Sequence, residues 1–244
     1  MSKRQFICLL LLLLVNNNFL LYNKKRCGRE CLSMFITLEG PEGSGKTTVS
    51  KRIIEILKEK GYDVIYTREP GGSEIAESIR NIILDKKNVL MDSKTEVLLF
   101  AASRRQHLVE RVIPALKEGK IVICDRFLDS SLAYQGHARG AGIDAVYQVN
   151  YYAIEGSMPD VTVYFDVTPE VGLNRINIDK NREVNRLDLE KVDFHNKVRE
   201  GYLILCDRYP ERIKKIDASK TIEEVVCDAM KVIEEKLKEK ELCK

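Results

Sequence analysis

Short apolar runs alternate along the chain with longer stretches in which apolar residues recur every three or four positions. The short runs are rich in β-branched and aromatic residues and predict strands at residues 34–38, 63–67, 120–124, 161–166 and 213–217. The longer stretches predict helices, chiefly over residues 45–60, 93–117, 190–208 and 221–238, with a shorter one after Ser73. This alternation predicts an α/β fold in which one five-stranded parallel sheet carries helices on both faces.

The first predicted strand ends at a glycine-rich loop, whose residues are Gly40, Pro41, Glu42, Gly43, Ser44, Gly45, Lys46, Thr47 and Thr48. From Gly40 to Thr47 the spacing is G-x-x-x-x-G-K-[ST], the phosphate-binding P-loop. Backbone N–H groups of such a loop and the N-terminus of the next helix bind anionic oxygens. Lys46 can reach the terminal phosphates, and the Thr47 hydroxyl suits Mg²⁺, which prefers hard oxygen ligands. The motif predicts a nucleotide site without indicating the nucleotide or the phosphate acceptor.

Charged residues follow two of the predicted strands, at the end where open parallel sheets bind ligands. Arg68 follows the second strand, and Asp125 and Arg126 follow the third. An arginine there can bind a phosphate through two parallel hydrogen bonds, and Asp125 is in the expected place of the second acidic group at a P-loop magnesium site. Arg80 lies on the helix after Ser73, where a solvated helix charge is an equally good interpretation.

Phe100 and Arg104 are four residues apart on a predicted helix and therefore lie on one face of it. In that arrangement a ring can stack on a planar base while a guanidinium donates hydrogen bonds to it. The alternative places Phe100 in the core and Arg104 in solvent, and the spacing alone does not separate the two.

Residues 174–190 differ in composition from the rest of the chain, because they contain few apolar residues and four cations: Arg175, Lys180, Arg182 and Arg186. A segment of this kind suits a lid that closes over phosphates. A solvated loop is the alternative.

Charge is distributed unevenly along the 244 residues. The chain carries a formal net charge of +3, but residues 1–33 contribute +5, which leaves −2 for the rest. A domain near neutrality is not expected to bind nucleic acid in general, so a substrate phosphate must be met by locally placed arginines. None of the seven cysteines forms a C-x-x-C pair, which favours reduced thiols in a cytoplasmic protein over a disulfide or zinc framework.

Residues 1–33 are interpreted as an extension outside the folded domain. The apolar run over residues 6–15 has the length of a signal-peptide core and is too short to span a bilayer. Three asparagines interrupt it at residues 16–18, no clear cleavage site follows, and Met34 stands directly before the first predicted strand. We expect a dispensable extension or a misassigned start, with a targeting peptide and a membrane anchor as alternatives.

Five segments in order resemble a single family. They are EGPEGSGKTT at residues 39–48, TREPGG at 67–72, LFAASRR at 99–105, Asp125–Arg126 with SSLAYQG at 130–136, and DVTPEVG at 166–172. Each is modest evidence alone, but together residues 34–240 resemble the bacterial thymidylate kinases (dTMP kinases), nucleoside-monophosphate kinases of the P-loop fold. The family lacks a counterpart of the first 33 residues, which fits a domain over residues 34–244.

The resemblance implies transfer of the γ-phosphoryl group of ATP to dTMP, with Mg²⁺ as cofactor and a homodimer as the assembly. It assigns residues 40–48 to ATP, Thr47 and Asp125 to Mg²⁺, and catalytic charge to Lys46 and Arg126. The residues that it assigns to dTMP are Arg68, Arg80 and Arg126 for the phosphate, Glu42 and Tyr134 for the sugar, and Phe100, Arg104 and Gln135 for the base.

The family carries its catalytic arginine either in the P-loop or in the lid. The P-loop here has no arginine, so the lid at about residues 174–190 must supply it, with Arg182 and Arg186 as candidates and Arg175 behind them. Three rival functions remain: a kinase for another nucleotide or a deoxynucleoside, a P-loop switch protein, and a degenerate, membrane-tethered nucleotide-binding protein suggested only by residues 1–33. The chain lacks the Asn-Lys-x-Asp motif of a guanine-reading switch. Membrane contact is expected only if residues 1–33 are retained.

Overall fold

The structure, a computed structural model, describes residues 32–178 and 186–242. Its sheet consists of the parallel strands β1 (Met34–Glu39), β2 (Val64–Arg68), β3 (Ile121–Asp125), β4 (Val161–Asp166) and β5 (Ile213–Asp217). Their order is β2-β3-β1-β4-β5, so the predicted five-stranded parallel sheet is confirmed. The three central strands are almost entirely buried, because helices cover the sheet on both sides, as is usual for parallel sheets.

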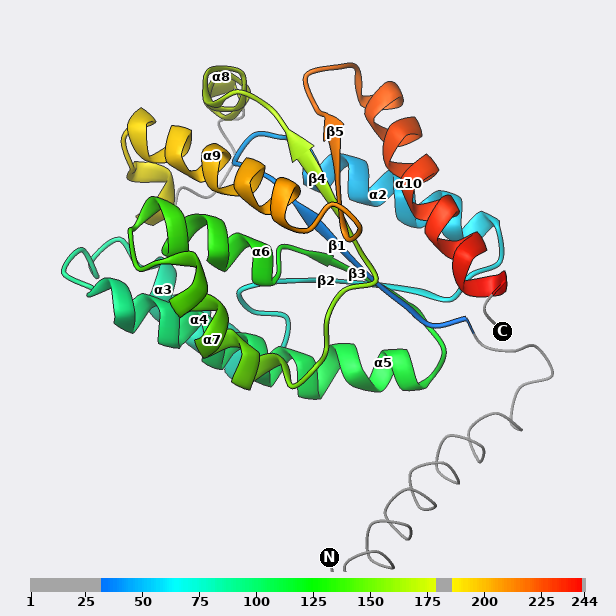
Figure 1. The fold of residues 1–244 in the computed structure, drawn as a ribbon, viewed down its shortest axis with the longest axis horizontal. Coiled ribbons are helices and arrows are strands. Elements are labelled where there is room, and N and C mark those ends of the chain that lie inside the picture. Colours follow the sequence, from blue (N-terminus) through cyan, green and yellow to red (C-terminus); the bar gives the residue numbers. More distant parts are fainter. Residues whose placement is uncertain (1–31, 179–185, 243–244) are drawn as a thin grey trace, which may run out of the picture. The chain divides into compact units, whose positions relative to one another are not determined.

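The helices form two layers around this sheet (Figure 1). On one face α2 (Lys46–Glu59) lies beside α10 (Ile222–Leu242). The opposite layer contains α3 (Glu74–Leu84), α4 (Ser93–His107), α5 (Ile113–Lys117), α6 (Leu128–Ser131), α7 (Ile143–Ile154) and α9 (Val192–Arg208). Helix α8 (Pro169–Ile178) and the short 3₁₀ helix η3 (Arg186–Leu189) lie on either side of residues 179–185, which are outside the described residues.

Two helical segments are wider than an α-helix. Residues 93–117, predicted as one helix, contain a π-helical turn, η1 (Leu108–Val112), between α4 and α5. Pro114 lies two residues after this turn and has no N–H to donate to a carbonyl oxygen in it, so a regular α-helical ladder of hydrogen bonds would be broken there in any case. A second π-helical segment, η2 (Leu132–Ala138), follows the short helix α6. Such segments often occur at functional sites, and η2 carries Tyr134 and Gln135.

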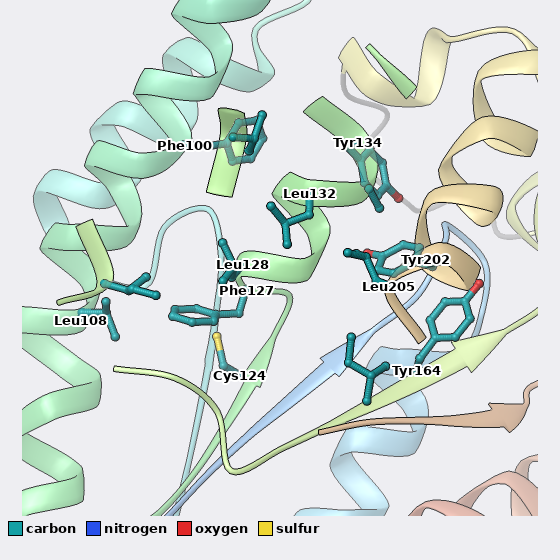
Figure 2. Packing of buried hydrophobic residues seen from close by; sticks show 14 of the residues in the cluster. Phe100, Leu108, Cys124, Phe127, Leu128, Leu132, Tyr134, Tyr164, Tyr202 and Leu205 are labelled. Carbon is teal, nitrogen blue, oxygen red and sulfur yellow. The ribbon is translucent and has the colours of Figure 1, made fainter. Parts of the chain in front are cut away.

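The main apolar core lies between the sheet and the layer that contains η2 and α9 (Figure 2). Phe35 of β1 packs edge-on against Phe127, with ring centroids 5.0 Å apart. Tyr164 of β4 stacks on Tyr202 of α9 at 4.8 Å. Offset and edge-on ring pairs add oriented contacts to the apolar area that they bury. They therefore hold α9 at a defined place above the carboxyl ends of the strands.

Strand register brings the chemically important residues to one edge of the sheet. Leu38 of β1 lies opposite Asp125 of β3, and Asp125 lies opposite Arg68 of β2. The P-loop continues from β1, so it, Asp125 and Arg68 emerge side by side. This is the edge at which open α/β sheets bind ligands.

The compact unit that contains the sheet begins at Ser33. Residues 1–31 lie outside the described residues, so the interpretation of residues 1–33 as an extension stays a prediction. In residues 32–178 and 186–242, no helix combines the length and the apolar character needed to cross a membrane.

Candidate active site

A cavity of about 600 Å³ lies where β1, β2 and β3 end. P-loop residues 42–48 line it. It is also lined by most of the residues predicted for substrate and metal: Arg68, Arg80, Phe100, Asp125, Arg126, Tyr134 and Gln135. The fold therefore brings together residues that are up to about ninety positions apart in the chain.

The P-loop backbone requires glycine at two positions. Gly43 and Gly45 have φ angles of 70° and 84°, which side chains disfavour. A Cβ on Gly43 would lie 2.1 Å from the carbonyl oxygen of Gly172, so the loop packs directly on α8. Gly45 is the residue before α2 and has no side chain to cap that helix, which leaves its first N–H groups to a ligand.

Lys46 is the first residue of α2, and its side chain folds back across the loop. Nζ donates to the carbonyl oxygens of Gly40 at 2.9 Å and Pro41 at 3.0 Å, and to Oγ of Ser44 at 3.1 Å. Burial, assisted by the charge of Arg126, lowers the pKa of Lys46 to about 8. An anionic phosphate beside Nζ would favour the charged ammonium, so ligand binding and protonation of Lys46 support each other.

Glu42 places a carboxylate inside the P-loop and at the wall of the cavity. The Tyr134 hydroxyl lies 2.8 Å from each of its oxygens, and Arg126 Nη2 donates to Oε1 at 3.1 Å. His195 of α9 has Nδ1 3.6 Å from Oε2. Burial alone would raise the pKa of Glu42, but Arg126, His195 and Lys46 hold it well below its usual range. Glu42 is therefore an ionised hydrogen-bond acceptor at neutral pH.

Arg126 follows β3 with a φ of 68°, a backbone conformation that non-glycine residues adopt rarely. Its N–H donates to the carbonyl oxygen of Leu38 at 2.9 Å, which holds the turn against β1. Nη1 lies 3.2 Å from Oγ of Ser130, and the guanidinium lies 5.0 Å from the centre of the Tyr134 ring. Because surrounding contacts hold this unfavourable backbone, the guanidinium is fixed in place before a ligand arrives.

Arg68 and Arg80 converge on the turn after β2. Arg68 Nη1 and Arg80 Nη1 both donate to the carbonyl oxygen of Pro70, at 2.9 Å and 2.8 Å. Glu77 balances part of this charge, since its Oε1 lies 3.0 Å from Arg68 Nη2. Two guanidinium groups around one oxygen form a site that suits an anion. The structure places Arg80 at the cavity wall rather than on an isolated helix surface.

Phe100 and Arg104 share a face of α4 but differ in their surroundings. Phe100 lines the cavity, whereas Arg104 is only 1% exposed and is not among the lining residues. Arg104 donates to Glu69 at 2.8 Å and to the carbonyl oxygen of Phe127 at 2.9 Å. It also bonds to Ser131 at 3.0 Å and to Asn150. The alternative that left Arg104 in solvent is wrong, while a contact between Arg104 and a base stays a prediction.

The three arginines considered for the lid have different positions. Arg182 lies outside the described residues. Arg186 is buried, pairs closely with Glu96, and donates to the carbonyl oxygen of Ile83 at 3.0 Å. Arg175 of α8 lines the main cavity and donates to the carbonyl oxygen of Ala218 at 2.9 Å. Arg175, which was ranked behind the other two, is therefore the one of the described pair that faces the P-loop cavity.

The donor set at the end of β3 fits a magnesium ion. Oδ1 of Asp125 is buried and has no hydrogen-bond partner among the described residues, although Oδ2 accepts from the Tyr66 hydroxyl at 3.3 Å. Thr47 is exposed at the wall of the same cavity. A carboxylate oxygen and a hydroxyl facing one cavity are hard ligands of the kind that Mg²⁺ takes together with water and phosphate oxygens.

Sequence reasoning did not identify a second set of polar residues beneath the site. Glu39, at the end of β1, accepts from the Phe127 N–H at 2.7 Å, from Ser130 Oγ at 2.6 Å and from the Tyr202 hydroxyl at 2.8 Å. Burial, together with the charge of Asp129, raises the pKa of Glu39 to about 7. The available signal was an acidic residue directly before Gly40 at the end of an otherwise apolar strand.

Comparisons with known proteins agree with this geometry. The family model for thymidylate kinase matches residues 38–229. A thymidylate kinase of Clostridium novyi is 64% identical over 191 residues, covering 78% of this chain and 93% of the relative. A thymidylate kinase of Bacillus velezensis is 61% identical over 209 residues, covering 86% and 99%. The crystal structure of thymidylate kinase from Ehrlichia chaffeensis superposes with a TM-score of 0.67 at 37% identity, covering 83% and 99%. The chain belongs to the thymidylate kinase family.

Proposed function

We propose that this chain phosphorylates dTMP with ATP, by direct in-line transfer of the γ-phosphoryl group, and releases dTDP and ADP. The observation that supports this best is one cavity in which a P-loop meets Arg68, Arg80 and Arg126. A P-loop accounts for the phosphates of ATP, and the three arginines suit a second anionic group. A nucleotide-dependent switch would have no acceptor phosphate for them.

The proposed transfer needs no general base, because a phosphate oxygen is already a nucleophile at neutral pH. Catalysis then rests on positioning and on neutralising the charge of the transferring group. Entry of phosphates would draw Lys46 Nζ away from the carbonyl oxygens that it now contacts. Arg126, held beside Glu42 and Ser130, would contact the acceptor phosphate.

Thr47 and Asp125 are the residues that would hold the Mg²⁺ ion. When bound, the ion neutralises charge on the phosphate oxygens of ATP. Asp125 also has Tyr66 and Arg68 beside it, so its carboxylate is oriented by the sheet before any ion binds.

The same cavity offers contacts for the sugar and the base of dTMP. Phe100 supplies an apolar face for the pyrimidine, Gln135 lines the same cavity, and Arg104 is buried on the same helix as Phe100. Glu42 is ionised and can accept from a 3′-hydroxyl group, while the Tyr134 ring, whose hydroxyl bonds to Glu42, would crowd a 2′-hydroxyl group. We expect both features to favour a deoxyribonucleotide.

The source of the lid arginine stays a prediction for Arg182 and Arg186. For catalysis Arg186 would have to exchange its pairing with Glu96 for a phosphate. Arg175 would have to release only backbone carbonyl oxygens, those of Ala218 and Gly43 among them, and it already lies on the cavity wall.

We also propose a homodimer formed through α4 and α7. Leu98 of α4 and Val109 of η1, which directly follows α4, are 58% and 46% exposed, and Tyr151 on the neighbouring α7 is 61% exposed. Large exposed apolar side chains on two contacting helices are typical of association surfaces.

The free thiols of Cys124, Cys206 and Cys227 fit the expected cytoplasmic location, with membrane contact only if residues 1–33 are retained.

A substrate panel tests the proposed activity. The purified chain is assayed with ATP and Mg²⁺ against dTMP, dUMP, GMP, CMP and thymidine, with ADP release as the readout. We expect the highest kcat/KM for dTMP. A higher value for another monophosphate or for thymidine would assign a different kinase activity, and nucleotide binding without turnover on any acceptor would support the switch.

A further inference from the structure

Glu96 is a buried carboxylate that none of the roles above explains. It lies on α4, one turn before Phe100, and is 1% exposed. A charge removed from water is costly unless it is paired and hydrogen-bonded. A carboxylate at this buried position, one helical turn from Phe100, therefore needs specific hydrogen-bond and ion-pair partners.

The two carboxylate oxygens of Glu96 serve two different segments. Oε1 accepts from Nε2 of Gln135, in η2, at 2.8 Å. Oε2 pairs closely with Nη2 of Arg186, in η3, and Arg186 in turn donates to the carbonyl oxygen of Ile83. Nε of Arg139 lies 3.6 Å from Oε1 and adds further positive charge. The guanidinium groups of Arg186 and Arg139 thus compensate the negative charge of Glu96, and Oε1 of Glu96 accepts the hydrogen bond from the Gln135 amide.

This contact determines which way the Gln135 amide faces. An ionised carboxylate accepts hydrogen bonds and cannot donate them, so only the NH₂ side of the amide can point at Glu96. The carbonyl oxygen Oε1 of Gln135, on the other branch of the amide, is then directed away from Glu96. Because Gln135 also lines the main cavity, the amide offers an acceptor there and keeps its donors for Glu96.

A hydrogen-bond acceptor distinguishes thymine from cytosine by whether the ring nitrogen N3 carries a hydrogen. Thymine carries an N–H donor at N3, whereas cytosine has an unprotonated acceptor at the same atom. A fixed carbonyl oxygen satisfies the first and repels the second, and sites that hydrogen-bond a substrate donor reject analogues that lack it. A freely rotating amide could serve either base.

Glu96 also lines a second cavity, of about 360 Å³. Its lining includes Glu96, Arg139, Arg186 and Glu190. Glu190 forms an ion pair with Arg139, with its Oε1 2.7 Å from Nη2. Glu190 therefore lines the same cavity as Glu96 and pairs with the same arginine, so its substitution serves as a control for the substitution of Glu96.

We propose that Glu96 is a positioning residue for base selection: it fixes the Gln135 amide with its carbonyl oxygen toward the pyrimidine and so favours thymine over cytosine. This inference rests on the proposed dTMP kinase function. It assigns Glu96 no contact with substrate. Its effect passes through Gln135, while Arg186 and Arg139 neutralise the buried charge.

The test is the ratio of kcat/KM for dTMP to kcat/KM for dCMP in the full chain and in Glu96→Gln. The glutamine at 96 can donate or accept, so the Gln135 amide is free to invert. We expect the ratio to fall about tenfold, through a higher KM for dTMP and a lower KM for dCMP, with KM for ATP unchanged. Glu190→Gln should keep the wild-type ratio.

A double-mutant cycle with Gln135→Ala separates positioning from a general structural effect. In the Gln135→Ala background, Glu96→Gln should leave the ratio unchanged, because no amide remains to be oriented. If Glu96→Gln does not fold, Glu96→Asp takes its place. Its carboxylate is withdrawn by about one methylene, so the ratio should fall in the same direction by a smaller factor.

The outcomes separate this inference from the function on which it rests. A wild-type chain that fails to phosphorylate dTMP overturns the proposed function. An active wild type whose Glu96 variants keep the ratio, or lose kcat equally for both nucleotides, overturns only the role of Glu96. A fall in the ratio of the same size with and without Gln135 also overturns it.

Discussion

Individual charges in this site are held by the protein before any ligand is present. Lys46 donates hydrogen bonds to three oxygens of its own loop, and Glu42 accepts hydrogen bonds from Tyr134 and Arg126. Such preorganisation lowers the reorganisation that binding would otherwise require. Each of these side chains must also break a hydrogen bond within the protein when a ligand binds. A single substitution therefore changes both the contact with the ligand and the structure of the ligand-free loop.

Replacement of Lys46 by alanine should abolish most of the turnover. The ammonium is the P-loop group expected to neutralise the terminal phosphates, and loss of one preorganised donor of this kind typically lowers kcat by about 10²–10³. The measurement is steady-state ADP release with dTMP as acceptor. Lys51→Ala, on an exposed part of α2, serves as the control and should retain the wild-type rate. A wild-type kcat for Lys46→Ala would contradict the site assignment.

Glu39 should make stability depend on pH. Its pKa is raised from 4.5 to about 7, so the folded protein binds a proton there more tightly than the unfolded chain does. This stabilisation is complete below about pH 4.5 and is lost as the pH rises through about 7. Glu39→Gln, which resembles the protonated form at every pH, should gain stability relative to wild type between pH 5 and pH 8, by up to about 3 kcal/mol.

Chemical denaturation of wild type and Glu39→Gln at pH 5, 6, 7 and 8 measures this difference. Glu59→Gln, on the exposed side of α2, should follow wild type at every pH. A constant difference between Glu39→Gln and wild type across this range would show that the Glu39 carboxyl does not titrate there.

At the scale of elements, the active site depends on how loops and helix ends meet. The P-loop packs against α8 so closely that neither Gly43 nor Gly172 has room for a side chain. The π-helical segment η2 brings Tyr134 to the P-loop and Gln135 to α4. Helix α9, anchored by the Tyr202–Tyr164 stack, adds a hydroxyl beneath the site. Each contact joins elements that are distant in sequence.

Gly43→Ala should separate the P-loop from α8. The new Cβ would lie 2.1 Å from the Gly172 carbonyl oxygen, and φ at this position is 70°. We expect a loss of about 2–3 kcal/mol in unfolding free energy and a higher KM for ATP. Gly61→Ala isolates the backbone strain, since φ is 86° and no atom of residues 32–178 or 186–242 lies within 4 Å of the position of its Cβ. Its loss should be about 1 kcal/mol with an unchanged KM, and equal effects of the two variants would argue against the α8 contact.

For the whole molecule, the exposed face of α4 leads to a prediction about assembly. Leu98→Glu adds a charge where the proposed dimer buries an apolar surface, so the variant should be a monomer at micromolar concentrations at which wild type is a dimer. Sedimentation velocity measures the difference. Leu90→Glu is the control, because Leu90 is 95% exposed in the connection before α4 and should leave the dimer intact. A dimeric Leu98→Glu would exclude this face, and a monomeric wild type would exclude the homodimer.

Much of this architecture was predictable because it depends on local patterns. The five strands follow from short β-branched runs, and their parallel arrangement follows from the alternation with helices. The same alternation places the residue after each strand at one edge, which is why Arg68, Asp125 and Arg126 could be located in advance. The π-helical turn at residues 108–112 was missed because this stretch keeps a helix-like spacing of apolar positions.

The sequence by itself determined the P-loop, the strand-end charges and the family resemblance, since these lie in contiguous motifs whose geometry is set by neighbouring residues. Only the tertiary structure decided that Arg80 lines the cavity, that Arg104 is buried, and that Arg186 pairs with Glu96. It also revealed the contact between Glu39 and Tyr202, across 163 residues. The physical reason is that a charged side chain acquires its role from the partner it meets, and that partner belongs to another element brought near by packing.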